Sequence, residues 1–187
     1  MQLILVRHPQ PLVAPGICYG RTDLAVAPEQ LKQTMTALST TLPRGLPIYS
    51  SPLQRCASLA IQLAPLLHSP APVLDARIAE MDFGDWEMQP WDDIPRVAID
   101  AWAADLVNYR PGGGESVLQM ATRIAAFHAD LQRQLNPDNG SAIVVCHAGA
   151  MRLLSACHNG LAPPEMALQA AQTPHQIPYG ATLTLRN

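Results

Sequence analysis

The chain has 187 residues, of which 48% are hydrophobic, and a formal net charge of -3. This length and composition suit a single domain over residues 1–187 with one sizeable core. The charge excludes a general basic surface for nucleic acid, and no window approaches the roughly 18 apolar residues of a membrane span. We therefore expect the protein to bind neither nucleic acid nor a membrane. No secretory signal is visible and the four cysteines form no CxxC pair, which favours reduced thiols in the cytoplasm.

Lysine is almost absent from the chain. Lys32 is the single lysine, and the sequence places it on a surface helix. A Schiff-base enzyme or a lysine-bearing phosphate loop is therefore hard to build from this chain. Any bound anion must be held mainly by arginine.

Proline and glycine divide the chain into alternating strand-like and helix-like segments, a pattern typical of an α/β fold. The apolar run Leu3–Val6 predicts a buried strand, and an irregular segment over 9–28 follows it. The later predicted elements are a helix over 29–42, a strand over 47–49, a helix over 53–67, a strand over 73–74, a loop over 79–90, helices over about 91–107 and 115–135, a strand over 142–145, helices over 150–157 and 164–171, and a strand over 181–185. The triple glycine at 112–114 is typical of a flexible connection.

Polar residues follow three of the predicted strands, at the point where each strand ends. Arg7 and His8 follow the first strand, Arg55 lies one turn into the helix after the second, and His147 follows the strand over 142–145. Ligands of open α/β sheets bind at such strand ends, so we expect these side chains to line one pocket. Two arginines and two histidines make a cationic site for a phosphate dianion, with no metal or other cofactor.

Phosphoryl transfer is the chemistry that this set of residues fits. An imidazole nitrogen can attack phosphorus and form a phosphohistidine intermediate. The leaving oxygen also needs a proton, and Glu80 can donate it if its partly apolar neighbours keep it protonated. Asp82, Glu87 and Glu115 are alternative acids, although each also suits a surface position.

Four segments resemble successive motifs of the histidine phosphatase superfamily, also called phosphoglycerate mutase-like. They are LILVRHP, YSSPLQRCASLA, EMDFGDWE and VVCHAGAMR, and they occur in that family's order. The resemblance implies a three-layer α/β fold with a mixed, mostly parallel central sheet flanked by helices. It implies that His8 is the phosphorylated nucleophile, that Arg7, Arg55 and His147 complete the phosphate pocket, and that Glu80 is the general acid.

Further segments are similar to the α-ribazole phosphatase branch of that superfamily. They are CYGRTD, WDDIP and PGGGES. This similarity implies hydrolysis of α-ribazole 5'-phosphate or adenosylcobalamin 5'-phosphate in cobalamin biosynthesis. The alternatives are a broad-specificity phosphatase for small phosphates or sugar phosphates, a phosphoglycerate mutase, and a noncatalytic phosphate-binding protein. A mutase needs additional closing segments, for which this chain has little room, and a binding protein does not need Glu80.

A few positions depart from the family's pattern. Proline replaces the usual glycine after the nucleophile, and methionine replaces the glycine expected after the Trp-Glu pair. The departing residues are Pro9, Pro11, Ala14 and Met88. Gln10, Arg21 or Thr22 could supply the hydrogen bonds lost at the first three positions and contact the substrate.

The sequence also contains a second candidate phosphate site. Cys146 and Arg152 have the Cys-x5-Arg spacing of cysteine-dependent phosphatases, in which a strand-to-helix turn holds phosphate. That interpretation lacks the usual hydroxyl residue after the arginine and leaves Arg7, His8 and Glu80 without roles. The remaining histidines, His68, His128, His158 and His175, lack metal-ligand spacing. Nothing in the sequence indicates an oligomeric state.

Overall fold

A five-stranded sheet with the strand order β3-β2-β4-β1-β5 forms the centre of the protein. The structure is a computed structural model that describes residues 1–135, 140–172 and 177–186. Its strands are β1 (Gln2–Arg7), β2 (Ile48–Ser50), β3 (Val73–Leu74), β4 (Ser141–Cys146) and β5 (Thr182–Arg186). Every pairing is parallel except that of β5, which runs antiparallel to β1 at one edge. The sheet is therefore mixed and mostly parallel, as predicted.

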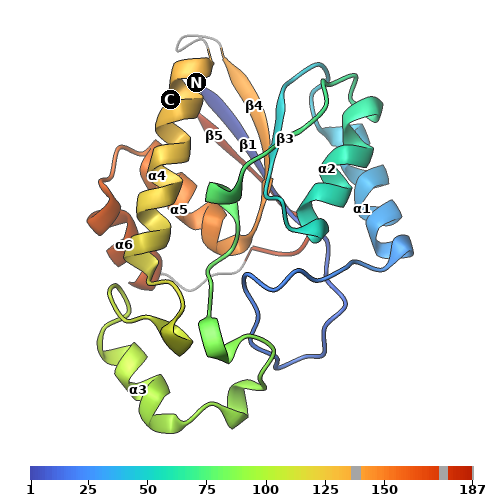
Figure 1. Ribbon diagram of the computed structural model, residues 1–187. Helices are drawn as coiled ribbons and strands as arrows, with labels where there is room; N and C mark the ends of the chain where they lie inside the picture. Colours follow the sequence, from blue (N-terminus) through green and yellow to red (C-terminus); the bar gives the residue numbers. More distant parts are fainter. Residues whose placement is uncertain (136–139, 173–176, 187) are drawn as a thin grey trace.

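Helices cover both faces of this sheet (Figure 1). One layer consists of α1 (Pro28–Thr41) and α2 (Gln54–Leu66), and the other of α4 (Val117–Gln134), α5 (Ala148–His158) and α6 (Pro163–Gln172). Successive side chains of β1 point to opposite layers, so that Leu3 and Leu5 pack with the α4 layer while Ile4 and Val6 pack with the α2 layer. Burial on both faces explains why β1 is apolar without alternation. No helix among the described residues is long and apolar enough to cross a membrane.

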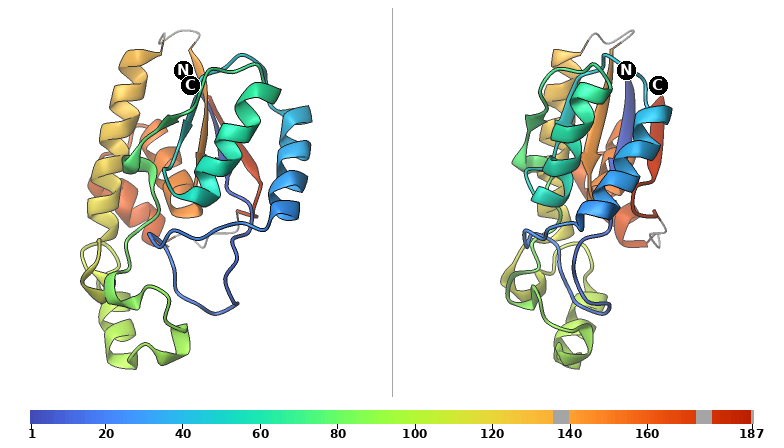
Figure 2. Two further views of the ribbon diagram at one scale, coloured as in Figure 1. Left: turned by 45° about the vertical axis from the view of Figure 1, so that its right-hand side comes forward. Right: turned by 90° about the vertical axis from the view of Figure 1, so that its right-hand side faces the viewer.

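The carboxyl ends of β1, β2 and β4 face two irregular segments (Figures 1 and 2). The first covers residues 8–27 and the second covers residues 79–114. The second segment carries α3 (Arg96–Ala104), which lies beyond the end of the sheet. A cavity is lined by Arg7 at the end of β1 and by residues of both of these segments.

The helix predicted over residues 91–107 is wrong in its extent. The chain instead forms a short 3-10 turn at Trp91–Asp93, passes through an extended Ile94, and begins α3 only after Pro95. Proline disfavours helical dihedrals in the residue before it, which separates the two pieces. The helix then ends at Ala104 rather than 107.

The triple glycine is a close backbone contact rather than a flexible connection. A Cβ atom on Gly112 would lie 2.2 Å from the carbonyl oxygen of Phe83, and one on Gly114 would lie 2.2 Å from that of Asp82. Gly112 also has a φ of 57°. Helix α4 then begins at Val117 with Ser116 as its N-cap, so the predicted first-turn positions 115 and 116 precede the helix.

Candidate active site

A cavity of about 520 Å³ opens at the carboxyl ends of the parallel strands. Arg7, His8, Arg55 and Glu80 all line it, although they come from three different segments of the chain. The volume falls in the range of small-molecule sites, roughly 300 to 1,000 Å³. The structure thus brings four of the five residues predicted for catalysis and phosphate binding to one surface.

His8 is nearly fully buried, and its ring is held in one tautomer by its own neighbour. Its Nδ1 lies 2.6 Å from the carbonyl oxygen of Pro9. A carbonyl oxygen only accepts hydrogen bonds, so Nδ1 carries the proton and Nε2 keeps its lone pair. Burial, together with the positive charges of Arg55 and Arg7, lowers the pKa of His8 to about 3, against the opposing effect of the Pro9 hydrogen bond. The ring is therefore neutral and nucleophilic at physiological pH.

Arg7 lies between the cavity and the last strand of the sheet. Its guanidinium carbon is 4.0 Å from the ring centroid of Tyr179, and its Nη1 donates to the carbonyl oxygen of Ile177. The ring of Tyr179 also lies 5.5 Å from the ring of His8. The antiparallel pairing of β1 with β5 explains these contacts, because it places the residues before β5 next to those after β1.

Arg55 is a fully buried arginine whose position depends on the segment over residues 8–27. It lies in the first turn of α2, and its Nη1 donates to the carbonyl oxygen of Thr22 at 2.7 Å while its Nη2 donates to that of Gly20. Its Nε has no hydrogen-bond partner within the described part of the chain. A buried guanidinium with a free donor beside His8 can bind an anion.

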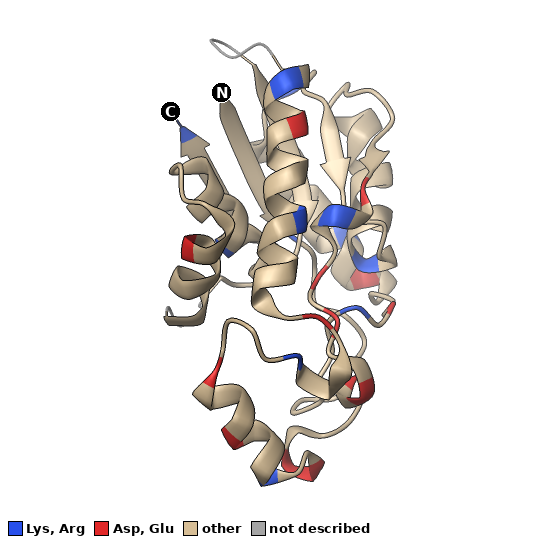
Figure 3. Ribbon diagram, turned by 60° about the vertical axis from the view of Figure 1, so that its left-hand side comes forward, with Lys and Arg blue, Asp and Glu red and all other residues tan. Residues whose placement is uncertain are grey.

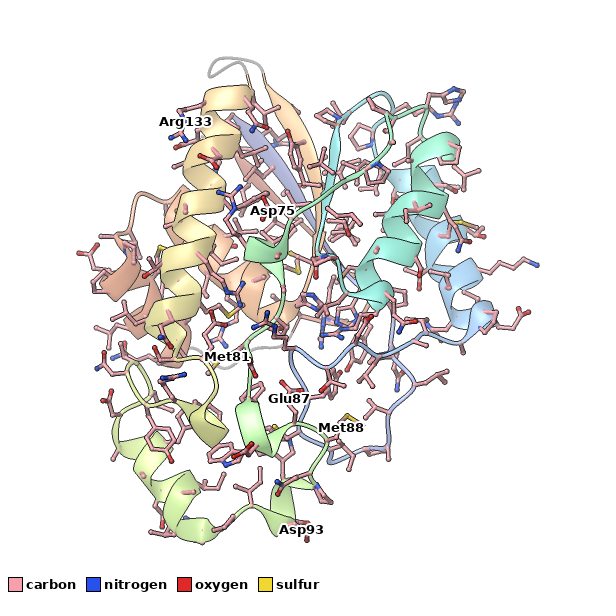
Figure 4. The ribbon with its side chains drawn as sticks, viewed as in Figure 1. Asp75, Met81, Glu87, Met88, Asp93 and Arg133 are labelled. Atoms are coloured by element: carbon pink, nitrogen blue, oxygen red, sulfur yellow. The ribbon has the colours of Figure 1, made fainter. Side chains whose placement is uncertain are left out.

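Glu87 holds the segment that Arg55 contacts. Its carboxylate accepts hydrogen bonds from the backbone N–H groups of Gly20, Arg21 and Thr22, and from the hydroxyl of Thr22 at 2.5 Å. Burial raises the pKa of this carboxyl, but the hydrogen bonds from Thr22 and from backbone groups outweigh burial and lower the pKa overall. Glu87 is labelled in Figure 4 on the segment after Met81. It organises the loop rather than serving as the proton donor.

His147 lies beside His8 without lining the cavity itself. The two ring centroids are 5.0 Å apart, and Nε2 of His147 is 2.8 Å from the hydroxyl oxygen of Ser51. Burial and the nearby positive groups lower the pKa of His147 well below its usual value, so the ring is neutral. His147 is also the N-cap residue of α5, whose first residues, Ala148 and Gly149, do line the cavity. The N-terminus of a helix favours bound anions.

Glu80 lies next to the start of α5. One of its carboxylate oxygens accepts from the backbone N–H of Gly149 at 3.0 Å, and the other accepts from the N–H of Met81 at 3.1 Å. The backbone of this segment is held in turn by Arg123, which donates to the carbonyl oxygens of Ala79 and Glu80. These contacts direct a carboxyl group into the cavity that contains His8.

The chain matches one known protein family over most of its length. Residues 3–176 match the family model of the histidine phosphatase superfamily (branch 1). The chain belongs to the histidine phosphatase superfamily. It is a histidine-dependent phosphatase with the phosphoglycerate mutase-like fold.

Individual relatives of this histidine phosphatase differ in the substrates that they are named for. An adenosylcobalamin/α-ribazole phosphatase of Salmonella typhimurium is 28% identical over 83% of this chain and 78% of its own. A Hydrogenobacter thermophilus protein, provisionally named phosphoserine phosphatase 2, is 26% identical over 86% of this chain and 79% of its own. A mycobacterial glucosyl-3-phosphoglycerate phosphatase, solved with VO3, superposes with a TM-score of 0.79 at 25% identity, covering 99% of this chain and 92% of the other.

The fold is also that of a solved α-ribazole phosphatase from Shigella flexneri. The TM-score is 0.80 at 23% identity, covering 98% of this chain and 89% of the other. At that identity the likeness concerns the fold alone.

The three residues predicted as further substrate contacts lie outside this cavity. Gln10 is exposed and lines a separate surface hollow together with Pro11 and Ala14. Arg21 forms an exposed ion pair with Asp82 at 3.4 Å. Thr22 contributes its carbonyl oxygen to Arg55 and its hydroxyl to Glu87. In this histidine phosphatase the latter contacts support the phosphate site indirectly.

The rival cysteine is poorly placed for attack on a phosphate. Cys146 is completely buried at the end of β4 and does not line the cavity. Burial and the neighbouring Cys56 and Glu80 raise the pKa of its thiol well above the usual value, which keeps it protonated. A protonated, buried thiol is a small core residue rather than a nucleophile.

Metal ligands do not gather anywhere in the described ranges. No group of three or more histidine, cysteine or acidic side chains there could hold an ion. His128 and His158 lie 3.3 Å apart through their ring nitrogens and contact each other instead. His175 lies outside the described residues.

Sequence reasoning missed several residues that border the site. Tyr19 and Tyr179 both line the cavity, and their hydroxyl oxygens are 2.7 Å apart. Arg152, which the sequence left without a role, also lines the cavity. The position of Tyr179 just before the last strand was the available signal, but using it required knowing that this strand pairs with β1.

Proposed function

We propose that this protein hydrolyses phosphomonoesters by transferring the phosphoryl group to Nε2 of His8. The observation that carries the proposal is the hydrogen bond from Nδ1 to the Pro9 carbonyl, which leaves Nε2 unprotonated beside a cavity that Arg7 and Arg55 also line. Arg7 and Arg55 supply positive charge for the phosphoryl oxygens, where charge stabilisation is the main requirement of this reaction. His147, whose ring lies beside that of His8 although it does not line the cavity, is the remaining proposed phosphate contact.

The reaction then proceeds in two balanced steps. In the first, the P–N bond to His8 forms while the P–O bond to the alcohol breaks, and Glu80 gives its proton to the departing oxygen. In the second, water attacks phosphorus, Glu80 takes a proton from that water, and the P–N bond breaks to release inorganic phosphate. The acid and the nucleophile line the same cavity, as both steps require.

α-Ribazole 5'-phosphate, or adenosylcobalamin 5'-phosphate, is the proposed substrate, and the cytoplasm is the proposed compartment. The CYGRTD, WDDIP and PGGGES segments and the Salmonella relative support this assignment. The second candidate is another small phosphate or sugar phosphate. The names of the Hydrogenobacter and mycobacterial relatives support that alternative.

Trapping the intermediate tests the mechanism. The enzyme is mixed with a 32P-labelled phosphomonoester and quenched, and the bound label is then exposed to acid and to alkali. We expect an acid-labile, alkali-stable label in the native protein and in Cys146→Ser, and no label in His8→Ala. Loss of the label in Cys146→Ser alone would sink the histidine mechanism.

Comparison of kcat/KM values tests the substrate. We expect α-ribazole 5'-phosphate to exceed 3-phosphoglycerate, O-phosphoserine and glucose 6-phosphate by at least about a hundredfold, the range reached by a site with matched contacts. Similar values for all four compounds would remove the cobalamin assignment in favour of a broad-specificity phosphatase.

A further inference from the structure

The cavity continues well beyond the residues that hold the phosphate. Its remaining wall is formed mainly by apolar side chains of the segment over residues 79–114 and of α4, namely Phe83, Trp91, Trp102, Leu106, Val117 and Met120. A volume of about 520 Å³ leaves most of the space to the part of the substrate that carries no phosphate. That part of the substrate therefore contacts carbon surface.

Three aromatic rings of this wall are held in fixed mutual orientations. The rings of Trp91 and Trp102 are nearly parallel, with 7° between their planes and 6.1 Å between their centroids. Phe83 meets both of them edge-on, at 5.9 Å from Trp91 and 6.0 Å from Trp102. Such packing leaves little side-chain entropy to lose when a flat ligand binds.

The charge of the same segment disfavours a second anionic group on the substrate. Acidic residues outnumber arginines between residues 83 and 110, and Figure 3 shows them spread around α3. Arg152 is the one basic residue that lines the described cavity in addition to Arg7 and Arg55. Its Nη2 already donates to the carbonyl oxygen of Ala170, and burial lowers its pKa although Glu80 opposes this.

We propose that Phe83, Trp91 and Trp102 form an aromatic subsite that binds a flat, uncharged aromatic group on the alcohol portion of the substrate. The inference rests on the proposed phosphatase function and assigns the residues that would bind an aromatic ring of the alcohol, whichever aromatic phosphomonoester is the substrate. Stacking of a ring on aromatic side chains, rather than hydrogen bonding or ion pairing, supplies the selectivity.

A matched pair of substrates tests this subsite. α-Ribazole 5'-phosphate and ribose 5-phosphate contain the same type of ester bond on the same sugar carbon, and they differ in the aromatic base. We expect kcat/KM to be at least about tenfold higher for the compound with the base, a ratio typical of one stacked ring. Equal values for the two compounds would overturn the subsite.

Variants locate the effect in the wall. We expect Trp91→Ala and Trp102→Ala to bring the ratio of the two kcat/KM values down toward one, and Trp91→Phe to keep most of it. Trp86 is the matched control, because it packs 5.8 Å from Trp102 in the same cluster but does not line the cavity. We expect Trp86→Phe to leave the ratio unchanged. A ratio that survives both alanine variants would contradict the proposal.

Two further outcomes separate this proposal from the function on which it rests. Equal kcat/KM values for adenosine 5'-phosphate and α-ribazole 5'-phosphate would support the aromatic subsite but would remove the cobalamin assignment. A preference for O-phosphoserine or 3-phosphoglycerate would overturn the subsite and indicate that Arg152 binds a carboxylate. The mechanism at His8 is tested separately by the label, so its failure is visible even when the ratio holds.

Discussion

Met88 has a backbone conformation that most residues avoid. Its φ is 65°, in the left-handed region that favours glycine, and its side chain is 46% exposed. This is the position at which the histidine phosphatase pattern has glycine. Met88, labelled in Figure 4, therefore holds a backbone conformation that glycine would adopt without strain.

Met88→Gly is therefore expected to stabilise the protein. Relief of about 1 to 2 kcal/mol of strain exceeds the added entropy of the unfolded chain, about 0.5 to 1 kcal/mol. Urea unfolding measures the change, and Met88→Ala is the control because it shortens the side chain but keeps the strain. A Gly variant no more stable than the Ala variant would contradict this explanation.

Gly149 has no side chain and so leaves room for the carboxylate of Glu80. A Cβ atom there would lie 2.3 Å from Oε1 of Glu80, so Gly149→Ala must displace the proposed proton donor. We expect kcat on an alkyl phosphate to fall by roughly 100-fold, the lower end of what general acid catalysis contributes. Thermal stability should hold or rise, because alanine favours the helix.

A substrate with a good leaving group provides the internal control for Gly149→Ala. p-Nitrophenyl phosphate releases an oxygen that needs little protonation, so its hydrolysis should fall much less than that of the alkyl phosphate. Equal losses on the two substrates would mean that the substitution damages the site without acting through Glu80.

At the scale of elements, the site depends on a contact between two loops. Glu87, from the segment over 79–114, accepts hydrogen bonds from the backbone of residues 20–22, and the carbonyl oxygens of the same loop receive Arg55. The close backbone contacts of Gly112 and Gly114 with residues 82–84 hold the segment that carries Glu87. Neither loop forms an α-helix or a strand at these positions, so each is ordered by the other.

Glu87→Gln tests this dependence. The amide keeps the shape but has one acceptor oxygen in place of two, so several backbone N–H groups lose a charged acceptor and Arg55 loses its support. We expect KM for the phosphomonoester to rise about tenfold and the free energy of unfolding to fall by about 1 to 3 kcal/mol. Asp85→Asn is the matched control, because Asp85 lies two residues earlier, in the 3-10 turn Gly84–Trp86 that Glu87 follows. An unchanged KM in Glu87→Gln would show that Arg55 keeps its position without this loop contact.

At the scale of the whole molecule, buried neutral histidines make stability depend on pH. Burial lowers the pKa of His8 to about 3 and that of His128 to about 4, and it lowers that of His147 as well. The unfolded chain therefore binds protons below pH 6.5 that the folded chain does not bind. Stability from these groups is complete above about pH 6.5 and is lost as the pH falls toward 4.

Urea unfolding between pH 7.5 and 4.5 measures this loss. Each histidine contributes up to about 1.4 kcal/mol per pH unit below 6.5. His128→Gln lies outside the active site and should reduce the slope by about one histidine's share. A free energy of unfolding that is constant over this interval would show that the buried rings become protonated without cost.

Apolar runs bounded by turn residues predicted every strand of the sheet, including the exposed edge strands β3 and β5, and the helices on its faces. The convergence of Arg7, His8 and Arg55 on one cavity also followed from where strands end, whereas Glu80 was expected there from the family resemblance. The roles of these residues remain predictions. The predicted extent of the helix over 91–107 was wrong because Pro95 interrupts it. Tyr179 was missed because its position depends on the pairing of β1 with β5, which come from opposite ends of the chain.

The carbonyl group of Pro9 acquires a second importance once Nε2 of His8 is phosphorylated. A ring that keeps its Nδ1 proton while Nε2 bonds to phosphorus becomes an imidazolium, in a place where burial opposes positive charge. The carbonyl dipole 2.6 Å from Nδ1 then stabilises that cation, and it comes from the residue in which this chain departs from its family. Proline has no backbone N–H to donate, but its carbonyl oxygen accepts the hydrogen bond that stabilises the positively charged intermediate.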